Sequence, residues 1–350
     1  MSSRGAMSRS RQRGFTMVEL MIALLLGLLV VGAASSVFLS NRRVYGATEA
    51  VGRIQENQRA AFEILARDLR EAGGNPCMRF DAVVTDQFGI RIADPDMSFW
   101  NAFARGLVGA EGDGTTPDAI SIFSANRLSY RVTEHSRPNN GIKVAQQTDA
   151  ISNDQAAVIC NNDYAVAFIT SGVTASGTSI SYDGAANCAG NLTRPQASAT
   201  TCELIETSPA YCFSLGHGVA RSAADTTACP GGIGVSPAYV VIPDTVRWTL
   251  EANGRGGSSL FRTENGVRSE IAEGVIDLQL AYKLAGNALY LTAKELTADD
   301  WARVTAVHVR LAFQAERGAL GLGDVTGTGG AALRRDMSDY VVLRNRQDIQ

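Results

Sequence analysis

Residues 15–39 read FTMVELMIALLLGLLVVGAASSVFL, and this stretch decides the fold class of the chain. The fifteen residues from Leu20 to Ala34 have no polar side chain, and Glu19 is the one charged residue in the stretch. About 20 apolar residues are enough to span a bilayer as a helix. The preceding residues 1–14 contain four arginines and no acid. Because basic flanks stay in the cytoplasm, we predict a membrane-spanning helix that places the rest of the chain across the membrane.

A secretory signal peptide is the alternative interpretation of this segment. Such a peptide has a basic start, an apolar stretch of about 7–15 residues and a small-residue cleavage site, and Ala33-Ala34-Ser35 has a suitable composition. Two features argue against it: the apolar stretch is longer than in a signal peptide, and it contains Glu19. A carboxylate within the membrane costs about 2.5–3.5 kcal/mol. Glu19 therefore indicates a role that neither a plain anchor nor a signal peptide requires.

The segment from Arg13 to Ala23, RGFTMVELMIA, resembles the class III signal of type IV prepilins and type II secretion pseudopilins over all eleven residues. The resemblance implies that a prepilin peptidase cuts after Gly14 and methylates the new N-terminal residue, Phe15. It also implies that Glu19 pairs with the Phe15 ammonium of a neighbouring subunit and sets the register of assembly. Glycine suits a cleavage position because it lets a protease approach the backbone closely, and buried opposite charges are tolerable only as a pair.

Helical periodicity continues beyond the apolar stretch. A stripe of mostly apolar residues recurs at helical spacing, and most charged residues fall off it. Gly73-Gly74-Asn75-Pro76 is a stop signal, so we predict one helix from Thr16 to Ala72, roughly 85 Å long. A coiled coil is the alternative, but the short stripe with a glutamine favours packing on a sheet. The stripe consists of Val44, Ala47, Val51, Ile54, Gln58, Ala61, Leu65 and Leu69.

The chain after Pro76 changes to short segments in which apolar and polar residues alternate. Alternation is typical of half-buried strands, and Asn253–Gly257 and Asn265-Gly266 supply turns. Thr297–Asp300 indicate a cap for one short helix at Trp301. A long N-terminal helix packed on an antiparallel β-sheet domain predicts an α+β fold, which is also the pilin-like fold that the resemblance implies. The predicted strands are 119–124, 156–160, 164–170, 246–250, 276–282, 307–313 and 340–343.

Six cysteines form a separate pattern, without C-x-x-C and without a histidine at zinc-finger spacing. An even number of cysteines in a chain predicted to face the periplasm indicates disulfides; buried free thiols are the alternative. Four cysteines lie in residues 188–229, and we interpret about 184–236 as a disulfide-stapled insertion with three possible pairings. If those four cysteines pair among themselves, Cys77 and Cys160 remain as the third pair, a pairing that rests on the count of cysteines alone. The candidates are Cys77, Cys160, Cys188, Cys202, Cys212 and Cys229.

Catalytic and ligand-binding motifs do not indicate an enzyme. The sequence has no G-x-S-x-G, H-E-x-x-H or P-loop motif, so we expect no catalytic residue, cofactor or metal. Asp113 and Asp118 are the calcium candidates, but they do not match an EF-hand loop, and such residues usually form turns. Removal of the four leader arginines changes the net charge from −3 to −7 (−3 − 4), which argues against nucleic-acid binding.

The C-terminal half of the sequence indicates which members of this family the chain resembles most. Residues 259–262 and 271–282 resemble PilW-type minor pilins and the related J-type pseudopilins, and residues 300–307 and 342–345 are more similar to PilW. The resemblance implies a minor pilin that primes type IV pilus assembly at or near the fibre tip and supports twitching motility and adhesion. Its partners would be other minor pilins, the major pilin, a PilY-type tip adhesin, prepilin peptidase and the inner-membrane assembly platform. Residues 130–240 resemble no family that we recognise.

The predicted organisation has four parts. Residues 1–14 are a cleaved cytoplasmic leader, 15–39 the transmembrane or fibre-core half of the helix, 40–72 its periplasmic amphipathic half, and 73–350 a periplasmic β-rich domain. The chain would be a single-pass protein of a Gram-negative inner membrane and later part of the fibre tip. Two alternatives remain open: a J-type pseudopilin of a type II secretion system, and a membrane-anchored periplasmic binding protein or enzyme.

Overall fold

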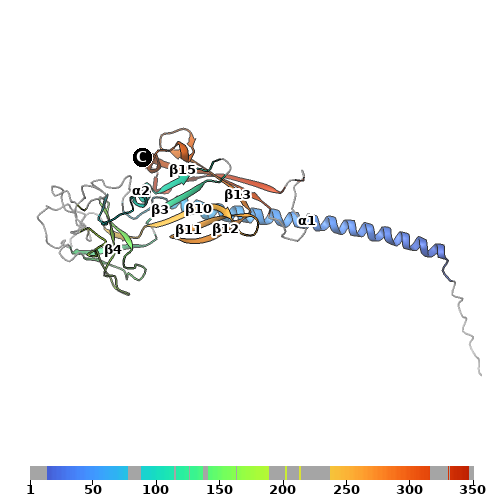
Figure 1. Ribbon diagram of the computed structural model, residues 1–350, viewed down its shortest axis with the longest axis horizontal. Helices are drawn as coiled ribbons and strands as arrows, with labels where there is room; N and C mark the ends of the chain where they lie inside the picture. The colour runs from blue at the N-terminus through green and yellow to red at the C-terminus, as the bar shows by residue number, and fades with distance from the viewer. Residues whose placement is uncertain are drawn as a thin grey trace, which may run out of the picture. The chain divides into compact units, whose positions relative to one another are not determined.

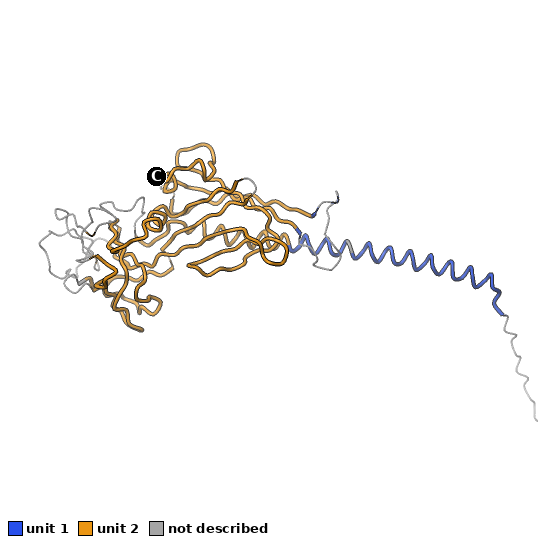
Figure 2. The backbone as a smooth tube through the Cα atoms, viewed as in Figure 1, with its two compact units in different colours: residues 1–53, 315–332 blue, residues 54–314, 333–350 orange. Residues whose placement is uncertain are grey.

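The protein is described by a computed structural model in two compact units. One unit comprises residues 1–53 and 315–332, and the other comprises residues 54–314 and 333–350 (Figure 2). We call them unit 1 and unit 2. The described residues are 14–77, 88–113, 116–125, 127–136, 141–162, 164–188, 202, 213, 237–315, 330 and 332–346.

The long helix α1 extends from Met17 to Glu71 (Figure 1). It begins one residue later and ends one residue earlier than predicted. Gly73 has a φ of 66°, in the left-handed region where a side chain is unfavourable, so the chain turns out of the helix there. The predicted stop signal therefore ends the helix for the expected reason.

The part of α1 that belongs to unit 2 is amphipathic. Ile54, Ala61, Leu65 and Leu69 are buried, as the predicted stripe requires. Gln58 is half-buried, and its Nε2 donates to the carbonyl oxygen of Arg335 at 3.4 Å. The stripe therefore packs on a folded domain. The stripe's first residue, Val44, belongs to unit 1 and is exposed.

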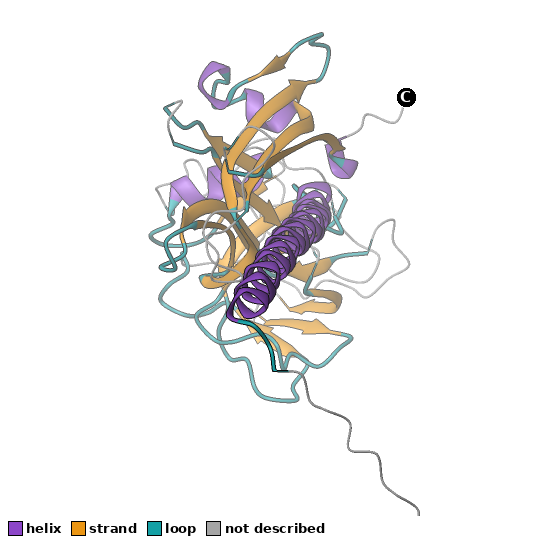
Figure 3. Cartoon of the chain, turned by 90° about the vertical axis from the view of Figure 1, so that its right-hand side faces the viewer, coloured by secondary structure: helices purple, strands orange, loops and turns teal. Residues whose placement is uncertain are grey.

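Strands make up most of the regular structure of unit 2 (Figure 3). A five-stranded antiparallel sheet has the order β12-β11-β10-β3-β2. Asn265 and Gly266, both with positive φ, form the tight turn between β11 and β12, as expected for a two-residue hairpin loop. The bounds are β2 (Leu107–Ala110), β3 (Ala119–Ser124), β10 (Asp244–Ala252), β11 (Ser258–Glu264) and β12 (Val267–Glu273).

A four-stranded antiparallel sheet has the order β14-β13-β15-β16. The chain passes from β12 into it through Gly274, whose φ is 76°. The inner face carries Leu280 and Tyr282 of β13 opposite Val309 and Val307 of β15, and all four side chains are buried. The bounds are β13 (Val275–Leu284), β14 (Tyr290–Leu291), β15 (Val304–Gln314) and β16 (Arg334–Val342).

A seven-stranded sheet has the order β1-β7-β6-β9-β4-β5-β8. Most of its strands lie between β3 and β10 in sequence, in the region that resembled no family. A bridge between Ser171 and Ser181 joins the segment after β7 to β8, so the sheet curves back around a core that includes Val132, Phe168 and Val240. The bounds are β1 (Phe88–Ile90), β4 (Ser129–Ser136), β5 (Gly141–Val144), β6 (Ala156–Cys160), β7 (Ala165–Ile169), β8 (Ser179–Ser181) and β9 (Tyr239–Val241).

The predicted α+β class, with a long helix and antiparallel sheets, is therefore confirmed, with one parallel pair, β1 on β7. The short helix expected at Trp301 is the 3₁₀ helix η2 (Asp300–Arg303). A second α-helix, α2 (Met97–Arg105), was not predicted. Asp96 caps it by accepting from the backbone N–H groups of Ser98 and Phe99, a local signal that the sequence does contain.

The last described residues connect several helix ends. Buried Arg346, in the 3₁₀ helix η3 (Arg344–Arg346), donates through its guanidinium to the carbonyl oxygens of Arg105 and Ala302, at the ends of α2 and η2. The amide of Asn345 lies 3.5 Å from the carbonyl oxygen of Ala72, just after α1. Carbonyl groups at helix ends lack partners within the helix, and these two side chains supply them.

Candidate functional site

The predicted cleavage site lies in exposed backbone before α1. Residues 14–16 are not helical, and Gly14 has no other atom within 4 Å of the position that a Cβ would occupy. Phe15 is 87% exposed. This open, non-helical segment is the kind of backbone that a peptidase can reach, and neither residue has a role in the packing of the described part of unit 1.

Glu19 takes part in a capping box at the start of α1. Its Oε2 lies 3.4 Å from both the backbone nitrogen and the hydroxyl of Thr16, and its own N–H donates to the Thr16 hydroxyl at 3.2 Å. The two residues thus satisfy each other's polar groups at the helix terminus. The role of Thr16 was not predicted, although the T-x-x-E spacing before an apolar run is a known signature of this arrangement.

The helix after Glu19 is apolar on every side. Leu20, Leu24, Leu25 and Leu28 are each more than half exposed, and the other large apolar side chains up to Leu39 are at least half exposed. Within the described residues, α1 is the one helix that is long and apolar enough to span a membrane. A helix with this surface needs an apolar environment around it.

A buried carboxylate, Asp68, attaches the second half of α1 to the five-stranded sheet of unit 2. Oδ2 of Asp68 accepts from the indole N–H of Trp248 on β10 at 2.9 Å and from Nε of Arg262 on β11 at 2.7 Å. Its Oδ1 accepts from Nη2 of the same arginine at 3.1 Å. Arg262 also contacts Glu264 at 2.5 Å. Burial of an ion pair is tolerable when hydrogen bonds satisfy the charges, and here they join α1 to the five-stranded sheet.

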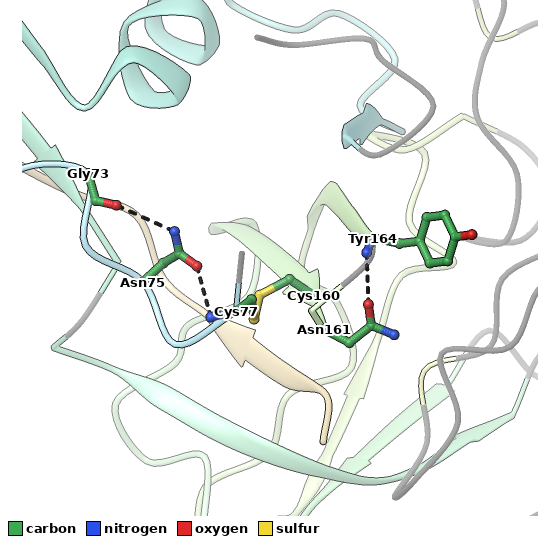
Figure 4. Close-up of a disulfide and its surroundings, with 6 residues drawn as sticks. All are labelled: Gly73, Asn75, Cys77, Cys160, Asn161 and Tyr164. Atoms are coloured by element: carbon green, nitrogen blue, oxygen red, sulfur yellow. Dashed lines mark hydrogen bonds between the residues drawn. A yellow bond between two sulfur atoms is a disulfide. The ribbon is translucent and has the colours of Figure 1, made fainter. Parts of the chain in front are cut away.

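A disulfide between Cys77 and Cys160 connects the segment after α1 to β6, with a Cα–Cα distance of 5.8 Å (Figure 4). The sequence predicts this pair only because the other four cysteines lie in the insertion. The backbone N–H of Cys77 donates to Oδ1 of Asn75 at 2.9 Å, and the N–H of Tyr164 donates to Oδ1 of Asn161 at 2.8 Å. The seven-stranded sheet is therefore covalently attached to the end of α1.

A second disulfide joins Cys188 and Cys202 within the predicted stapled insertion. Arg91 is fully buried beside it and donates from Nη1 to the carbonyl oxygen of Cys202 at 3.3 Å, and burial lowers the pKa of this guanidinium. Cys212 and Cys229 lie outside the described residues.

The two calcium candidates, Asp113 and Asp118, accept hydrogen bonds from other residues of the protein. Buried Asp118 accepts from the N–H of Gly112 at 2.8 Å and from the N–H of Leu280 at 2.7 Å. Oδ1 of Asp113 accepts from the N–H and the hydroxyl of Thr116, both at 2.9 Å. Among the described residues no group of three or more His, Cys, Asp or Glu could hold a metal ion. Asp113 thus holds a local turn, whereas Asp118 joins the loop at Gly112 to β13.

Three comparisons with known proteins bear on this site. A structural comparison finds a type IV-like pilin from Thermus thermophilus, with 10% identity, a TM-score of 0.29 and coverage of 85% of this chain and 98% of that chain. A comparison with curated proteins finds no match. A model of the family described as "Prokaryotic N-terminal methylation motif" matches residues 9–35. The chain therefore carries a prokaryotic N-terminal methylation motif around Gly14, Phe15 and Glu19.

Proposed function

We propose that the chain is a PilW-type minor pilin that helps to prime type IV pilus assembly. The observation that carries the proposal is the methylation motif at residues 9–35 at the start of a long apolar helix. The resemblance of residues 259–262 and 271–282 to PilW-type proteins supports the finer assignment. These residues lie in adjoining strands: the first range in β11, the second across β12 and β13.

The proposed maturation begins with a precursor in the inner membrane, its leader of residues 1–14 in the cytoplasm. Prepilin peptidase cuts between Gly14 and Phe15 and methylates the new amino group. The processed chain then has 350 − 14 = 336 residues. The exposed, non-helical backbone at Gly14 supports this step, because a peptidase requires access to an unfolded segment.

In the proposed assembly, the apolar half of α1 leaves the bilayer and packs among other pilin helices. Glu19 pairs with the Phe15 ammonium of a neighbouring subunit and sets the register. The surroundings of Glu19 support this role, because Glu19 is exposed and its hydrogen bonds are local ones to Thr16 at 3.4 Å, so the carboxylate is accessible to a neighbouring subunit. Pairing also lowers the free-energy cost of placing the carboxylate and the ammonium in an apolar environment, because each charge is costly there without a partner.

The proposed partners are other minor pilins, the major pilin, a PilY-type tip adhesin, prepilin peptidase and the inner-membrane assembly platform. The domain after residue 72 would lie in the periplasm and later near the fibre tip, and the chain would support pilus biogenesis, twitching motility and adhesion. Two disulfides in unit 2 support an oxidising compartment. We propose no catalytic activity and no cofactor.

The test is to solubilise native membranes in mild detergent, capture the tagged full chain and identify its partners by mass spectrometry. A Gly14→Val variant, which should keep its leader, is the matched control for partners that require the processed chain. Recovery of minor pilins, major pilin and tip adhesin supports the proposal. Recovery of secretion pseudopilins without pilins contradicts it and assigns the chain to a type II secretion system. Recovery of neither group contradicts both and leaves a membrane-anchored binding protein or enzyme.

A further inference from the structure

Three aromatic rings gather on the outward face of the four-stranded sheet. They belong to Tyr290 on β14, His308 on β15 and Tyr340 on β16, and we call them the aromatic platform. The rings of His308 and Tyr340 stack, with centroids 4.5 Å apart and 23° between their planes. The centroid of the Tyr290 ring lies 5.3 Å from that of Tyr340 and 6.0 Å from that of His308.

The sheet register explains how three strands contribute to one cluster. His308 is the cross-strand neighbour of both Ala281 on β13 and Tyr340 on β16. Tyr290 is the neighbour of Lys283, which lies opposite Ala306 on β15. The alanines are small, so the Tyr290 ring can lie across the sheet surface and approach the other two rings.

The platform is open to solvent at Tyr340, whereas Tyr290 and His308 are half-buried. Tyr340 is 58% exposed and the next side chain on the same face, Val342, is 50% exposed. One face of the Tyr340 ring is covered by His308. β16 is the last strand of its sheet among the described residues, so no further described strand covers the opposite face of the ring. Tyrosine is enriched at binding interfaces because its ring is apolar and its hydroxyl is polar.

The platform also offers hydrogen-bonding groups that the described protein does not use. Neither the Tyr290 hydroxyl nor the Tyr340 hydroxyl has a hydrogen-bond partner among the described residues. Lys283 holds its ammonium 5.5 Å from the centroid of the Tyr290 ring and donates to the carbonyl oxygen of Ala288 at 2.6 Å. An ammonium has three N–H donors, so further donors remain for a ligand.

The hairpin of β11 and β12 provides an internal contrast, because its exposed charges satisfy one another. Arg255 pairs with Glu270 and Glu273. Arg268 pairs with Glu251 and lies over the Phe261 ring at 3.6 Å from its centroid. The two arginines there already have partners within the protein. The aromatic platform instead combines an open ring face with tyrosine hydroxyl groups that have no partner among the described residues.

We propose that the aromatic platform binds a neutral oligosaccharide. The apolar C–H face of a sugar ring would stack on Tyr340, and sugar hydroxyls would bond to the two tyrosine hydroxyls and the Lys283 ammonium. This amphipathic pattern is suited to a ligand with one apolar face and a polar rim. The inference is independent of the proposed role in pilus assembly.

Two other classes of ligand suit the surface less well. A stable protein interface needs about 800 Å² and about 20–30 residues from each partner, and the platform with its immediate neighbours is much smaller. Single-stranded nucleic acid needs aromatic rings beside unneutralised cations. Here Arg310 and Arg334 both pair with Asp336, at 3.3 and 3.2 Å, and the chain has a net charge of −3.

The test uses the full chain in a detergent without a sugar headgroup, applied to an array of neutral, sialylated and uronic-acid oligosaccharides with a single-stranded oligonucleotide on the same slide. We expect binding to a neutral oligosaccharide and a loss of about tenfold or more in Tyr340→Ala. Tyr340→Phe should retain most of the binding, because the stacking face remains. Val267→Ala, at a residue of β12 that is 70% exposed, is the surface control and should bind as the unmodified chain does.

Several results would overturn the proposal. These are no glycan bound by the unmodified chain, equal binding by Tyr340→Ala, or a preference for the oligonucleotide or for acidic glycans. A thermal unfolding midpoint measured for each variant identifies loss of fold, and His308→Ala then provides a second variant of the same platform. Incorporation of Tyr340→Ala into fibres should be unchanged, so the outcome is separate from the pilin proposal.

Discussion

The two halves of α1 belong to one continuous helix but have opposite surfaces. Residues 17–39 are apolar on all sides and exposed, with Leu28 at 75%. Residues 54–71 bury one stripe, including Leu65 and Leu69, and carry paired charges on the other side, such as Arg59 with Glu63. A helix that is apolar all round needs a membrane or other helices around it, whereas an amphipathic helix packs on a domain. The helix is therefore built for two environments.

Glu19 in the first half and Asp68 in the second half also differ in where their hydrogen-bond partners lie in the sequence. Glu19 contacts Thr16, three residues away, so its hydrogen bonds are local. Asp68 contacts Trp248 and Arg262, which are 180 and 194 residues away. The first carboxylate is thus available to a partner outside the described fold, while the second is committed to the domain. The predictions below test this difference.

Gly14→Val should have the largest effect and should abolish cleavage of the leader. A Cβ and branched side chain at this position would keep a peptidase from approaching the backbone. The intact mass of the purified protein should then include residues 1–14. Gly32→Val is the control, since Gly32 lies in the apolar half of α1 and no atom beyond its own stretch of helix lies within 4 Å of its Cβ position. Normal cleavage of Gly14→Val would contradict the assigned site.

Glu19→Ala should leave cleavage intact and strongly reduce incorporation into fibres. Removal of the carboxylate leaves the neighbour's Phe15 ammonium without a partner in an apolar environment, which is costly. The measurement is the ratio of this chain to major pilin in sheared fibres, with Glu49→Ala as a control at an exposed residue outside the apolar half. Unchanged incorporation would show that Glu19 does not set the register.

Asp68→Ala should lower the free energy of unfolding of unit 2 by about 3–5 kcal/mol, because it removes the carboxylate that accepts from Arg262 and from the buried indole N–H of Trp248 and leaves Arg262 with Glu264 alone. The side chains of Arg262 and Asp68 are only 13% and 8% exposed, so water cannot replace the lost partner. Urea unfolding followed by the fluorescence of the three tryptophans, which all lie in unit 2, measures the change. Glu63→Ala, on the exposed side of the same half, is the matched control and should behave as the unmodified chain does.

Leu65→Ala should lower the same free energy by about 2–5 kcal/mol, through lost apolar contacts and a cavity. Leu65 is fully buried, whereas Leu25 is 62% exposed. Leu25→Ala should therefore leave the unfolding of unit 2 unchanged, although the side chain removed is identical. Equal effects of the two substitutions would contradict the division of α1 into two functional halves.

Thr16→Ala should have the smallest effect, a loss of about 0.5–2 kcal/mol of helix stability at the N-terminus. The substitution removes the hydroxyl that accepts from the N–H of Glu19. Faster amide exchange in the first turn of α1, with unchanged exchange near Leu65, is the expected result. Thr16→Ser keeps the hydroxyl and should restore protection.

Strands with strong alternation were predictable from the sequence alone. β3 and β6 have the predicted bounds, and β10, β13 and β15 extend the predicted segments by a few residues. The three-residue strands β1, β8 and β9 were not predicted, because so short a segment becomes a strand only through its pairing with distant neighbours. The curved sheet that they complete therefore could not be foreseen in residues 130–240.

The residues that we propose to be functional divide in the same way. Gly14, Phe15 and Glu19 lie within one short motif that the sequence alone identifies, and Thr16 could have been recognised by its spacing from Glu19. By contrast, nothing in the sequence distinguished Asp68 from the other charged residues near the predicted apolar stripe. The aromatic platform combines three residues separated by up to 50 positions, and the register of three strands decides that they meet.

The sequence by itself determined the long helix, its end at Gly73, the alternating strands and the processing motif, because these depend on residues near one another in the chain. Only the tertiary structure decided that Asp68 joins α1 to β10 and β11 and that the aromatic platform exists. It also shows that Cys77 pairs with Cys160. The physical reason is that local propensity and periodicity act over a few residues, whereas strand order, register and buried polar pairs are set by contacts between distant segments.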